Sequence, residues 1–172
     1  MKSHEGPRPQ TRQDLYPGIF ERAEAATRRS RLPGWRNGPA DAFRHIVASA
    51  EMARRYGSPI AKVLGEAHEL RGSAGGQPAE EAAMDRHNNN IGIAIGRDAT
   101  SFDDVVARAK ARISDAFSGR DLKPVERPKW LAPQQWINDP DRADEDQDNW
   151  PPAWTDGRAG GADRILDRKS VV

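Results

Sequence analysis

Hydrophobic residues recur at helical spacing through most of residues 18–119, and this periodicity constrains the fold more than any other feature. The clearest case begins at Ser101, which is a suitable N-cap with Asp104 three residues later, and closes at Gly119. Its hydrophobic face consists of Phe102, Val105, Val106, Ala109, Ile113 and Phe117. No segment shows the strict alternation of a half-buried strand. The sequence therefore predicts an all-α fold.

Prolines and glycines divide this region into about five helices. Before the helix that Ser101 caps, we expect four others, at 18–31, from Pro39 to just before Gly57, from Ser58 to Gly72, and from Pro78 onward. A single small helical bundle should occupy residues 12–119. The polar residues 1–11 are expected to form a flexible N-terminus.

The sequence changes in character after Gly119. Residues 120–172 are rich in proline, tryptophan and aspartate, and hydrophobic periodicity is absent. We therefore expect an irregular C-terminal tail, extended or disordered, whose tryptophans could pack back against the helical body.

Composition excludes several classes of function. The chain has no cysteine, which rules out disulfides, thiol catalysis and cysteine-based zinc sites. Its net charge of +1 and its short basic clusters give no strong nucleic-acid signal. We find no run long enough to span a membrane and no secretory signal peptide. The expected location is cytoplasmic, or outside the cell by a route without a classical signal peptide.

The segment MDRHNNNIGIAIG, residues 84–96, carries polar residues on one helical face. Asp85, Asn88, Asn89, Gly92 and Gly96 fall at i, i+3, i+4, i+7 and i+11. Asparagine is a poor interior helix residue, because its amide competes for backbone hydrogen bonds. The spacing indicates that these residues are placed for a purpose, and the glycines would let a backbone or a ligand approach closely.

The two preceding helices carry similar faces. One bears Asp41, His45, Ala48, Ser49 and Met52, and the other bears Ala61, Gly65, His68 and Gly72 with Glu69 adjacent. If these faces converge, they form a polar pocket inside the bundle, as in helical metal and catalytic sites. An unpaired buried polar group costs about 1–3 kcal/mol, which favours a functional site over packing alone. The alternative is that the asparagines only hydrogen-bond the helices together.

From this pocket we predict three sets of site residues. The catalytic set is His45, His68, Glu69 and Asp85; the substrate-binding set is Arg44, Asn88, Asn89 and Gly92; and the metal ligands are His45 and Asp85. The cofactor is unknown, with a divalent metal left open. Known templates fit poorly: AHELRG begins like the zinc motif H-E-x-x-H, but Gly72 occupies the second histidine position.

Three short motifs between residues 37 and 96 form a spaced set. They are ADAFRH at 40–45, GEAHE at 65–69, and D-x-x-N-N-x-x-G-x-x-x-G from Asp85 to Gly96. This set resembles a bacterial domain family of unknown function found in secreted polymorphic toxins of the Rhs and wall-associated type. The resemblance implies an enzyme-like effector domain and delivery to another cell or compartment, and it supplies no reaction.

Two functions follow as hypotheses. In the first, the protein is an effector-like hydrolase in which His45 is a general base or metal ligand and Asp85 orients it or binds metal. In the second, it is a non-catalytic interaction module, an adaptor of a secretion or conjugation system that binds a protein partner through its Trp- and Pro-rich tail.

Overall fold

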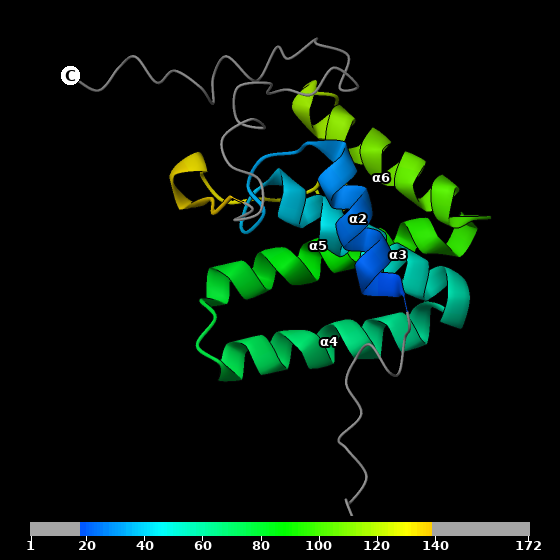
Figure 1. Ribbon diagram of the computed structural model, residues 1–172, viewed down its shortest axis with the longest axis horizontal. Helices are drawn as coiled ribbons and strands as arrows, with labels where there is room; N and C mark the ends of the chain where they lie inside the picture. The colour runs from blue at the N-terminus through cyan, green and yellow to red at the C-terminus, as the bar shows by residue number, and fades with distance from the viewer. Residues whose placement is uncertain (1–17, 139–172) are drawn as a thin grey trace, which may run out of the picture.

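The computed structural model describes residues 18–138, except the side chains of Glu69, Arg71 and Ser73. Within that span the chain is all-α, as predicted, and its only β-type pairing is an isolated bridge between Arg36 and Ile137 (Figure 1). The helices are α2 (Ile19–Ser30), α3 (Pro39–Tyr56), α4 (Ser58–Ala74), α5 (Ala79–Asp98) and α6 (Phe102–Phe117), followed by a short 3-10 turn, η1 (Pro133–Gln135). The predicted flexible segment 1–11 and residues 139–172 of the predicted tail lie outside the described residues.

The helix ends follow from local residue chemistry. Pro39 occupies the first turn of α3, where its missing N–H costs nothing, and Gly57 ends the helix with a φ of 88°. Ser101 caps α6 by accepting a hydrogen bond from the Asp104 N–H at 3.1 Å. The α3 and α6 boundaries therefore match the predictions closely, whereas α4 runs two residues past Gly72.

Helix α3 is the centre of the fold and contacts all four other helices. Its core side chains Phe43, Ile46, Val47 and Ala50 are completely buried. Helix α5 crosses it closely, because Gly92 and Gly96 carry no side chain there. A Cβ on Gly92 would collide with the Ile46 carbonyl oxygen, and one on Gly96 would collide with the Ala50 carbonyl oxygen. These two glycines therefore allow the α3 backbone to lie close to α5.

Glu51 is a fully buried carboxylate on α3 with a complete set of partners. Arg54 donates to it at 2.7 and 2.9 Å, and Arg55 donates at 2.6 Å. Burial alone would raise the pKa of Glu51, but the hydrogen bonds and charges of the two arginines outweigh it and hold this pKa below its ordinary value. This group is a satisfied structural ion cluster.

Residues 120–138 return along the bundle with little regular structure. Asn88 of α5 holds this segment: its side chain donates to the Lys129 carbonyl at 2.8 Å and accepts from the Lys129 N–H at 3.0 Å. Trp130 stacks on Phe117 with ring centroids 4.8 Å apart. The packed body thus continues past Gly119. Of the tryptophans in the predicted tail, Trp130 contacts α6 through Phe117, and the Trp136 indole N–H donates to the Leu131 carbonyl within residues 120–138. None of the helices within residues 18–138 is long and apolar enough to cross a bilayer.

Candidate functional site

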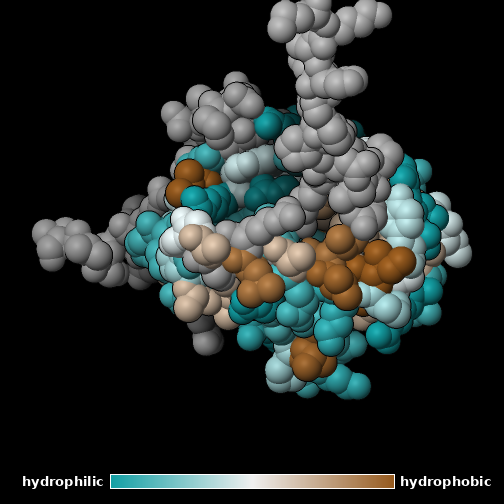
Figure 2. Space-filling model, turned by 90° about the horizontal axis from the view of Figure 1, so that it is seen from below, coloured by the Kyte–Doolittle hydropathy of each residue, from teal (hydrophilic) through white to brown (hydrophobic). Residues whose placement is uncertain are grey.

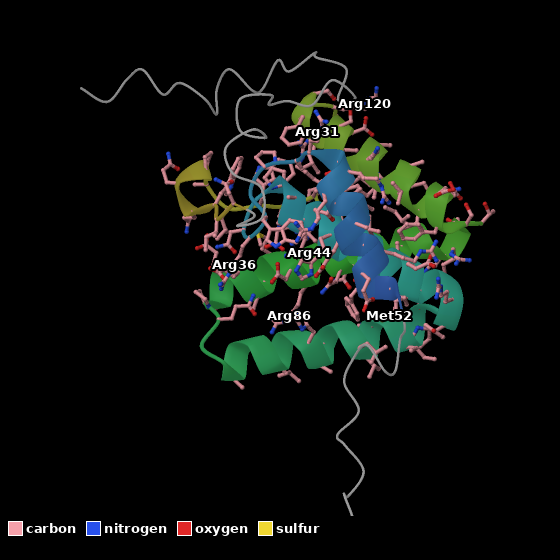
Figure 3. The ribbon with its side chains drawn as sticks, in the orientation of Figure 1. Arg31, Arg36, Arg44, Met52, Arg86 and Arg120 are labelled. Atoms are coloured by element: carbon pink, nitrogen blue, oxygen red, sulfur yellow. The ribbon has the colours of Figure 1, made fainter. Side chains whose placement is uncertain are left out.

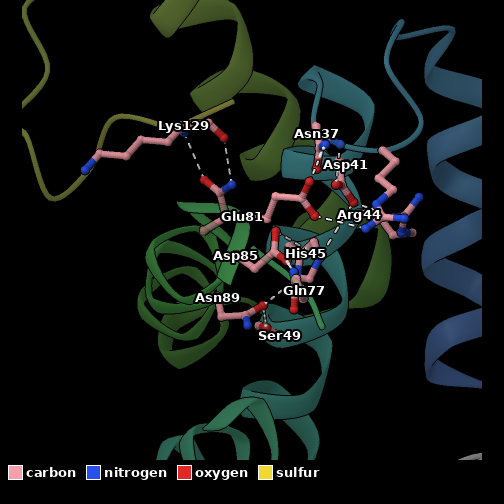
Figure 4. A network of polar contacts seen from close by, with 12 residues as sticks. Asn37, Asp41, Arg44, His45, Ser49, Gln77, Glu81, Asp85, Asn89 and Lys129 are labelled. Carbon is pink, nitrogen blue, oxygen red and sulfur yellow. Dashed lines mark hydrogen bonds and ion pairs between the residues drawn. The ribbon is translucent and has the colours of Figure 1, made fainter. Parts of the chain in front are cut away.

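A cluster of carboxylate, imidazole and amide groups lies where α3 crosses α5 (Figure 4). Helix α3 supplies Asp41 and His45, and α5 supplies Asp85 and Asn89, each pair one helical turn apart. His45 Nε2 is 3.6 Å from Asp41 Oδ1 and 3.4 Å from Asp85 Oδ1. One ligand atom from each of these three residues lies within 4.8 Å of the other two. The crossing therefore brings two carboxylates to the same ring nitrogen, Nε2 of His45.

The opposite side of the His45 ring fixes its tautomer. Nδ1 lies 3.1 Å from Asn89 Oδ1, and that same oxygen accepts a hydrogen bond from Ser49 Oγ at 2.9 Å. An amide oxygen can only accept, so Nδ1 carries a proton and donates it. In the neutral ring, Nε2 then presents a lone pair to the two carboxylates. This arrangement is electrostatically unfavourable until a cation or a proton lies between them.

The two carboxylates have unequal environments. Asp41 accepts from the Asn37 N–H at 2.7 Å and from the Arg44 guanidinium. Asp85 is 5% exposed; its Oδ2 accepts from Gln77 Nε2 at 2.8 Å, while its Oδ1 has no hydrogen bond. Burial raises the pKa of Asp85; the charge of His45 opposes this rise, and that of Asp41 adds to it. Asp85 Oδ1 is thus a buried acceptor aimed at His45 without a donor.

Two hollows meet at His45. A polar chamber of about 430 Å³ contains Asp41, Asp85 and Gln77 in its wall. A second hollow of about 380 Å³, which we call the α3/α4 groove, is lined by Phe20, Ala48, Met52, Ala61 and Gly65 besides polar residues. Both hollows are bordered by Arg44, His45 and His68. Ligands therefore have access to His45 from two chemically different sides.

The predicted site residues divide into those at the cluster and those elsewhere. His45, Asp85 and Asn89 lie together, an arrangement that the helical spacing permits but does not require. His68 of α4 stands beside them, with its ring centroid 6.2 Å from that of His45. Arg44 borders both hollows, while its guanidinium bonds Asp41 and the Trp35 carbonyl and stacks on the Trp35 ring. The side chain of Glu69 lies outside what the structure describes.

Two residues predicted to bind substrate do not face the cluster. Asn88 is completely buried and both its amide atoms bond the Lys129 backbone. Gly92 packs against Ile46 and Ser49 of α3. Residues at i and i+3 are 60° apart around a helix, so the residues from Asp85 to Gly96 do not share one environment. They face the cluster, the segment at Lys129, or the α3 backbone. We therefore assign Asn88 and Gly92 to the packing of the fold.

Sequence reasoning did not assign two residues that complete the cluster. Asp41 precedes His45 by one helical turn, and this D-x-x-x-H spacing on the first polar face was a usable signal. Gln77 comes from the glycine-containing loop between α4 and α5 and reaches Asp85. No periodicity marks a loop residue, so only the folded chain reveals this contact.

Comparison with known proteins places the chain in a family. It belongs to the family described as a domain of unknown function, DUF6973, which matches residues 20–117. This confirms the predicted membership of a domain family of unknown function, and the match is longer than the 37–96 region that carries the resemblance. No solved structure matches the chain.

Proposed function

We propose that the protein is a metal-dependent hydrolase whose divalent ion is held by Asp41 Oδ1, His45 Nε2 and Asp85 Oδ1. The observation that carries the proposal is the buried Asp85 Oδ1, which lacks a hydrogen bond and lies 3.4 Å from a ring nitrogen whose partner nitrogen is already a donor. A metal ion between them satisfies both atoms at once. Carboxylate and imidazole are common ligands of Zn²⁺ and Mn²⁺.

The spacing favours a metal ion over a proton. Ligand atoms about 2.1 Å from a metal stand about 3.0 Å apart in octahedral and about 3.4 Å apart in tetrahedral coordination. The Nε2–oxygen distances of 3.4 and 3.6 Å lie close to the tetrahedral value. A protonated His45 bound to either carboxylate would instead draw it to about 2.7–2.9 Å.

The surrounding side chains fit the role of orienting ligands. Metal-binding histidines normally donate their other ring N–H to an oxygen, as His45 does to Asn89. Gln77 and Asn37 donate to the second oxygens of Asp85 and Asp41. Asp85 Oδ1 is thereby left for the ion, and Asp41 Oδ1, which also accepts from Arg44, would offer its remaining lone pair. Hydrogen bonds from neighbouring residues therefore hold all three proposed ligands in place before an ion binds.

The reaction is the attack of water on an electrophilic carbonyl or phosphoryl centre. A divalent metal in this position would lower the pKa of its water and polarise the substrate oxygen. His68 borders the same hollow, with its ring centroid 6.2 Å from that of His45, and would be the group that gives a proton to the leaving group. Arg44, already tied to Asp41 and Trp35, offers fixed positive charge beside the developing oxyanion.

The biological role that we propose is that of an effector. Its support is the resemblance of residues 37–96 to domains of secreted polymorphic toxins. The alternative was an adaptor that binds its partner through the tail. Within residues 120–138, Trp130 stacks on the core and the Trp136 indole donates to Leu131, so neither favours the adaptor.

The experiment measures metal binding and activity on the same variants. Calorimetric titration of Zn²⁺ or Mn²⁺ into chelator-treated protein should give about one equivalent for the wild type and none for His45→Ala or Asp85→Asn. The matched control is His87→Ala, which removes a histidine of α5 that bonds the Arg127 carbonyl outside the cluster. Expression directed to the compartment of the target should harm cells only with wild type and control. Equal metal binding by wild type and both cluster variants would refute the proposal.

A further inference from the structure

The α3/α4 groove has a polar end and an apolar end. Because the chain turns at Gly57, α4 returns along α3, and the two histidine rings meet at one end. The other end is lined by Phe20, Met52 and Ala61. Arg44 and Met52, labelled in Figure 3, are eight residues apart on α3, which corresponds to about 12 Å along the helix axis.

The groove exists because the residues between the two helices are small. Ala48, Ala61 and Gly65 leave the space between α3 and α4 unfilled. Gly65 differs from Gly92 in a decisive way. A Cβ on Gly65 would meet only the Asn89 side chain, at an ordinary distance of 3.7 Å, whereas one on Gly92 would strike the α3 backbone. Glycine inside a helix costs about 1 kcal/mol relative to alanine, and helix packing does not require it at residue 65.

We propose that the α3/α4 groove binds the acyl chain of the substrate, an unbranched hydrocarbon whose carbonyl carbon lies at His45. This inference deepens the proposed hydrolase function and rests on it for the reaction. Water would add to the acyl carbon, the bond from that carbon to the leaving oxygen or nitrogen would break, and the leaving group would take the proton. The products are a free carboxylic acid and an alcohol or amine.

The chemistry of the lining selects this ligand over sugars and nucleotides. Besides the polar residues Arg44, His45 and His68, the lining contains Ser49 and Asn89, which hydrogen-bond each other, and Glu24. The remaining lining residues, Phe20, Ala48, Met52, Ala61 and Gly65, offer only hydrocarbon, thioether or backbone atoms. Sugar hydroxyls would lose water there without gaining hydrogen bonds, which costs about 1–3 kcal/mol each. The carboxylate of Glu24 would repel phosphates. A hydrocarbon chain has neither difficulty, and the volume of about 380 Å³ falls within the range of small-molecule pockets.

The outer face of α4 is also apolar, which suits a substrate that comes from a lipid phase. Val63 and Leu70 are 67% and 66% exposed and lie on the side of α4 opposite Gly65 and His68, while Ile60, 45% exposed, lies at the edge of that side. Figure 2, which views the molecule from the side of α4, shows hydrophobic surface on this face. The same helix thus lines the groove inside and presents hydrocarbon side chains outside.

The test measures binding of a dansyl-labelled undecanoic acid to metal-free protein by fluorescence. Gly65→Leu fills the groove, and Ala67→Leu is the matched control on the exposed side of the same helix. We expect saturable binding by wild type and control, and binding at least about tenfold weaker in Gly65→Leu, which is about 1.4 kcal/mol. Zn²⁺ affinity should be equal in all three. Absence of saturable binding by the wild type, or undiminished binding by Gly65→Leu, overturns the inference.

Two further measurements separate the groove from the reaction. If Gly65→Leu also weakens Zn²⁺ binding, a second variant, Met52→Glu, tests the groove separately, because it places a charge at the apolar end, away from the metal ligands. Undiminished probe binding by Met52→Glu overturns the inference. With p-nitrophenyl esters, hydrolysis should rise with acyl length in wild type and not in Gly65→Leu, and rates independent of acyl length count against an acyl substrate. Probe binding without Zn²⁺ binding or hydrolysis would refute the proposed hydrolase function but would still support the groove as a binding site for an acyl chain.

Discussion

Asp85→Asn should change the stability of the protein in opposite directions with and without metal. Without metal, Asp85 Oδ1 is a buried acceptor that lacks a donor and faces the lone pair of His45 and a carboxylate of Asp41. Asparagine keeps the shape and still accepts from Gln77, while its NH₂ group can donate where the orphaned oxygen stood. We therefore expect the metal-free variant to be more stable than the metal-free wild type.

The size of the gain follows from the cost of one unsatisfied buried group, about 1–3 kcal/mol. For a chain of this length, that corresponds to a rise of about 2–12 °C in the unfolding midpoint. The pH dependence follows from the raised pKa of Asp85. The folded state binds this proton more tightly than the unfolded state, so ionised Asp85 destabilises the fold at neutral pH. The advantage of asparagine should shrink as the pH falls through the folded-state pKa.

Metal should reverse the order of the two proteins. At 1,000 times its Kd, a ligand that binds only the folded state stabilises it by about 4.1 kcal/mol, which exceeds the metal-free advantage of asparagine. The wild type should gain this amount on adding Zn²⁺, and Asp85→Asn should gain almost nothing. Thermal melts by circular dichroism, at neutral and acidic pH and with and without Zn²⁺, test all three effects. A metal-free midpoint that drops by several degrees in Asp85→Asn would refute the reasoning, because it would show that the carboxylate is part of a structural network.

Glu51→Gln is the matched control for this experiment, since it makes the same chemical change in a buried carboxylate that is fully hydrogen-bonded. The lowered pKa of Glu51 means that its ionised form stabilises the fold above the unfolded-state pKa, and that this stability is lost as the pH falls through the folded-state pKa. Glutamine should therefore lower the midpoint at neutral pH. The partly exposed arginines limit the cost to about 1–3 kcal/mol.

Three other changes test the packing. Asn88→Ala should cost about 2–3 kcal/mol in urea unfolding, because it leaves the Lys129 N–H and carbonyl unpaired, yet Zn²⁺ affinity should stay the same. Gly92→Ala should lower both stability and Zn²⁺ affinity, since its Cβ strikes the Ile46 carbonyl and forces the helices apart; unchanged calorimetry would contradict this. Removing residues 120–172 should leave a helical spectrum but a lower midpoint, and an unaltered midpoint would show that the segment contributes nothing.

The helices could be predicted because their signals are local. Pro39 and Gly57 bracket α3, and Ser101 with Asp104 starts α6, so each boundary depends on a few neighbouring residues. The sequence also predicts that Asp85 and Asn89 share one face of α5, and Asp41 and His45 one face of α3, since residues one turn apart share a helix face. These inferences need no knowledge of how the helices cross.

The remaining features of the site depend on contacts between distant segments. Whether Asn88 faces the cluster or the returning segment is decided by a rotation of α5 of less than one residue, and the sequence does not specify that rotation. Gln77 enters through a loop, where no period applies. Asp41 was on the predicted face, but its role appears only when Asp85 of another helix approaches the same imidazole.

The close crossing of α3 and α5 should also determine which ions the cluster binds and which it rejects. Gly92 and Gly96 bring the two helices into backbone contact one and two turns beyond Asn89, so the cluster cannot widen without breaking that contact. Ca²⁺ requires six to eight oxygen ligands at about 2.3–2.6 Å and flexible surroundings. A fixed set of two carboxylates and one imidazole suits a smaller ion with nitrogen affinity. The protein should therefore ignore millimolar Ca²⁺ while it responds to Zn²⁺ or Mn²⁺, a selectivity set by two residues that touch no ion.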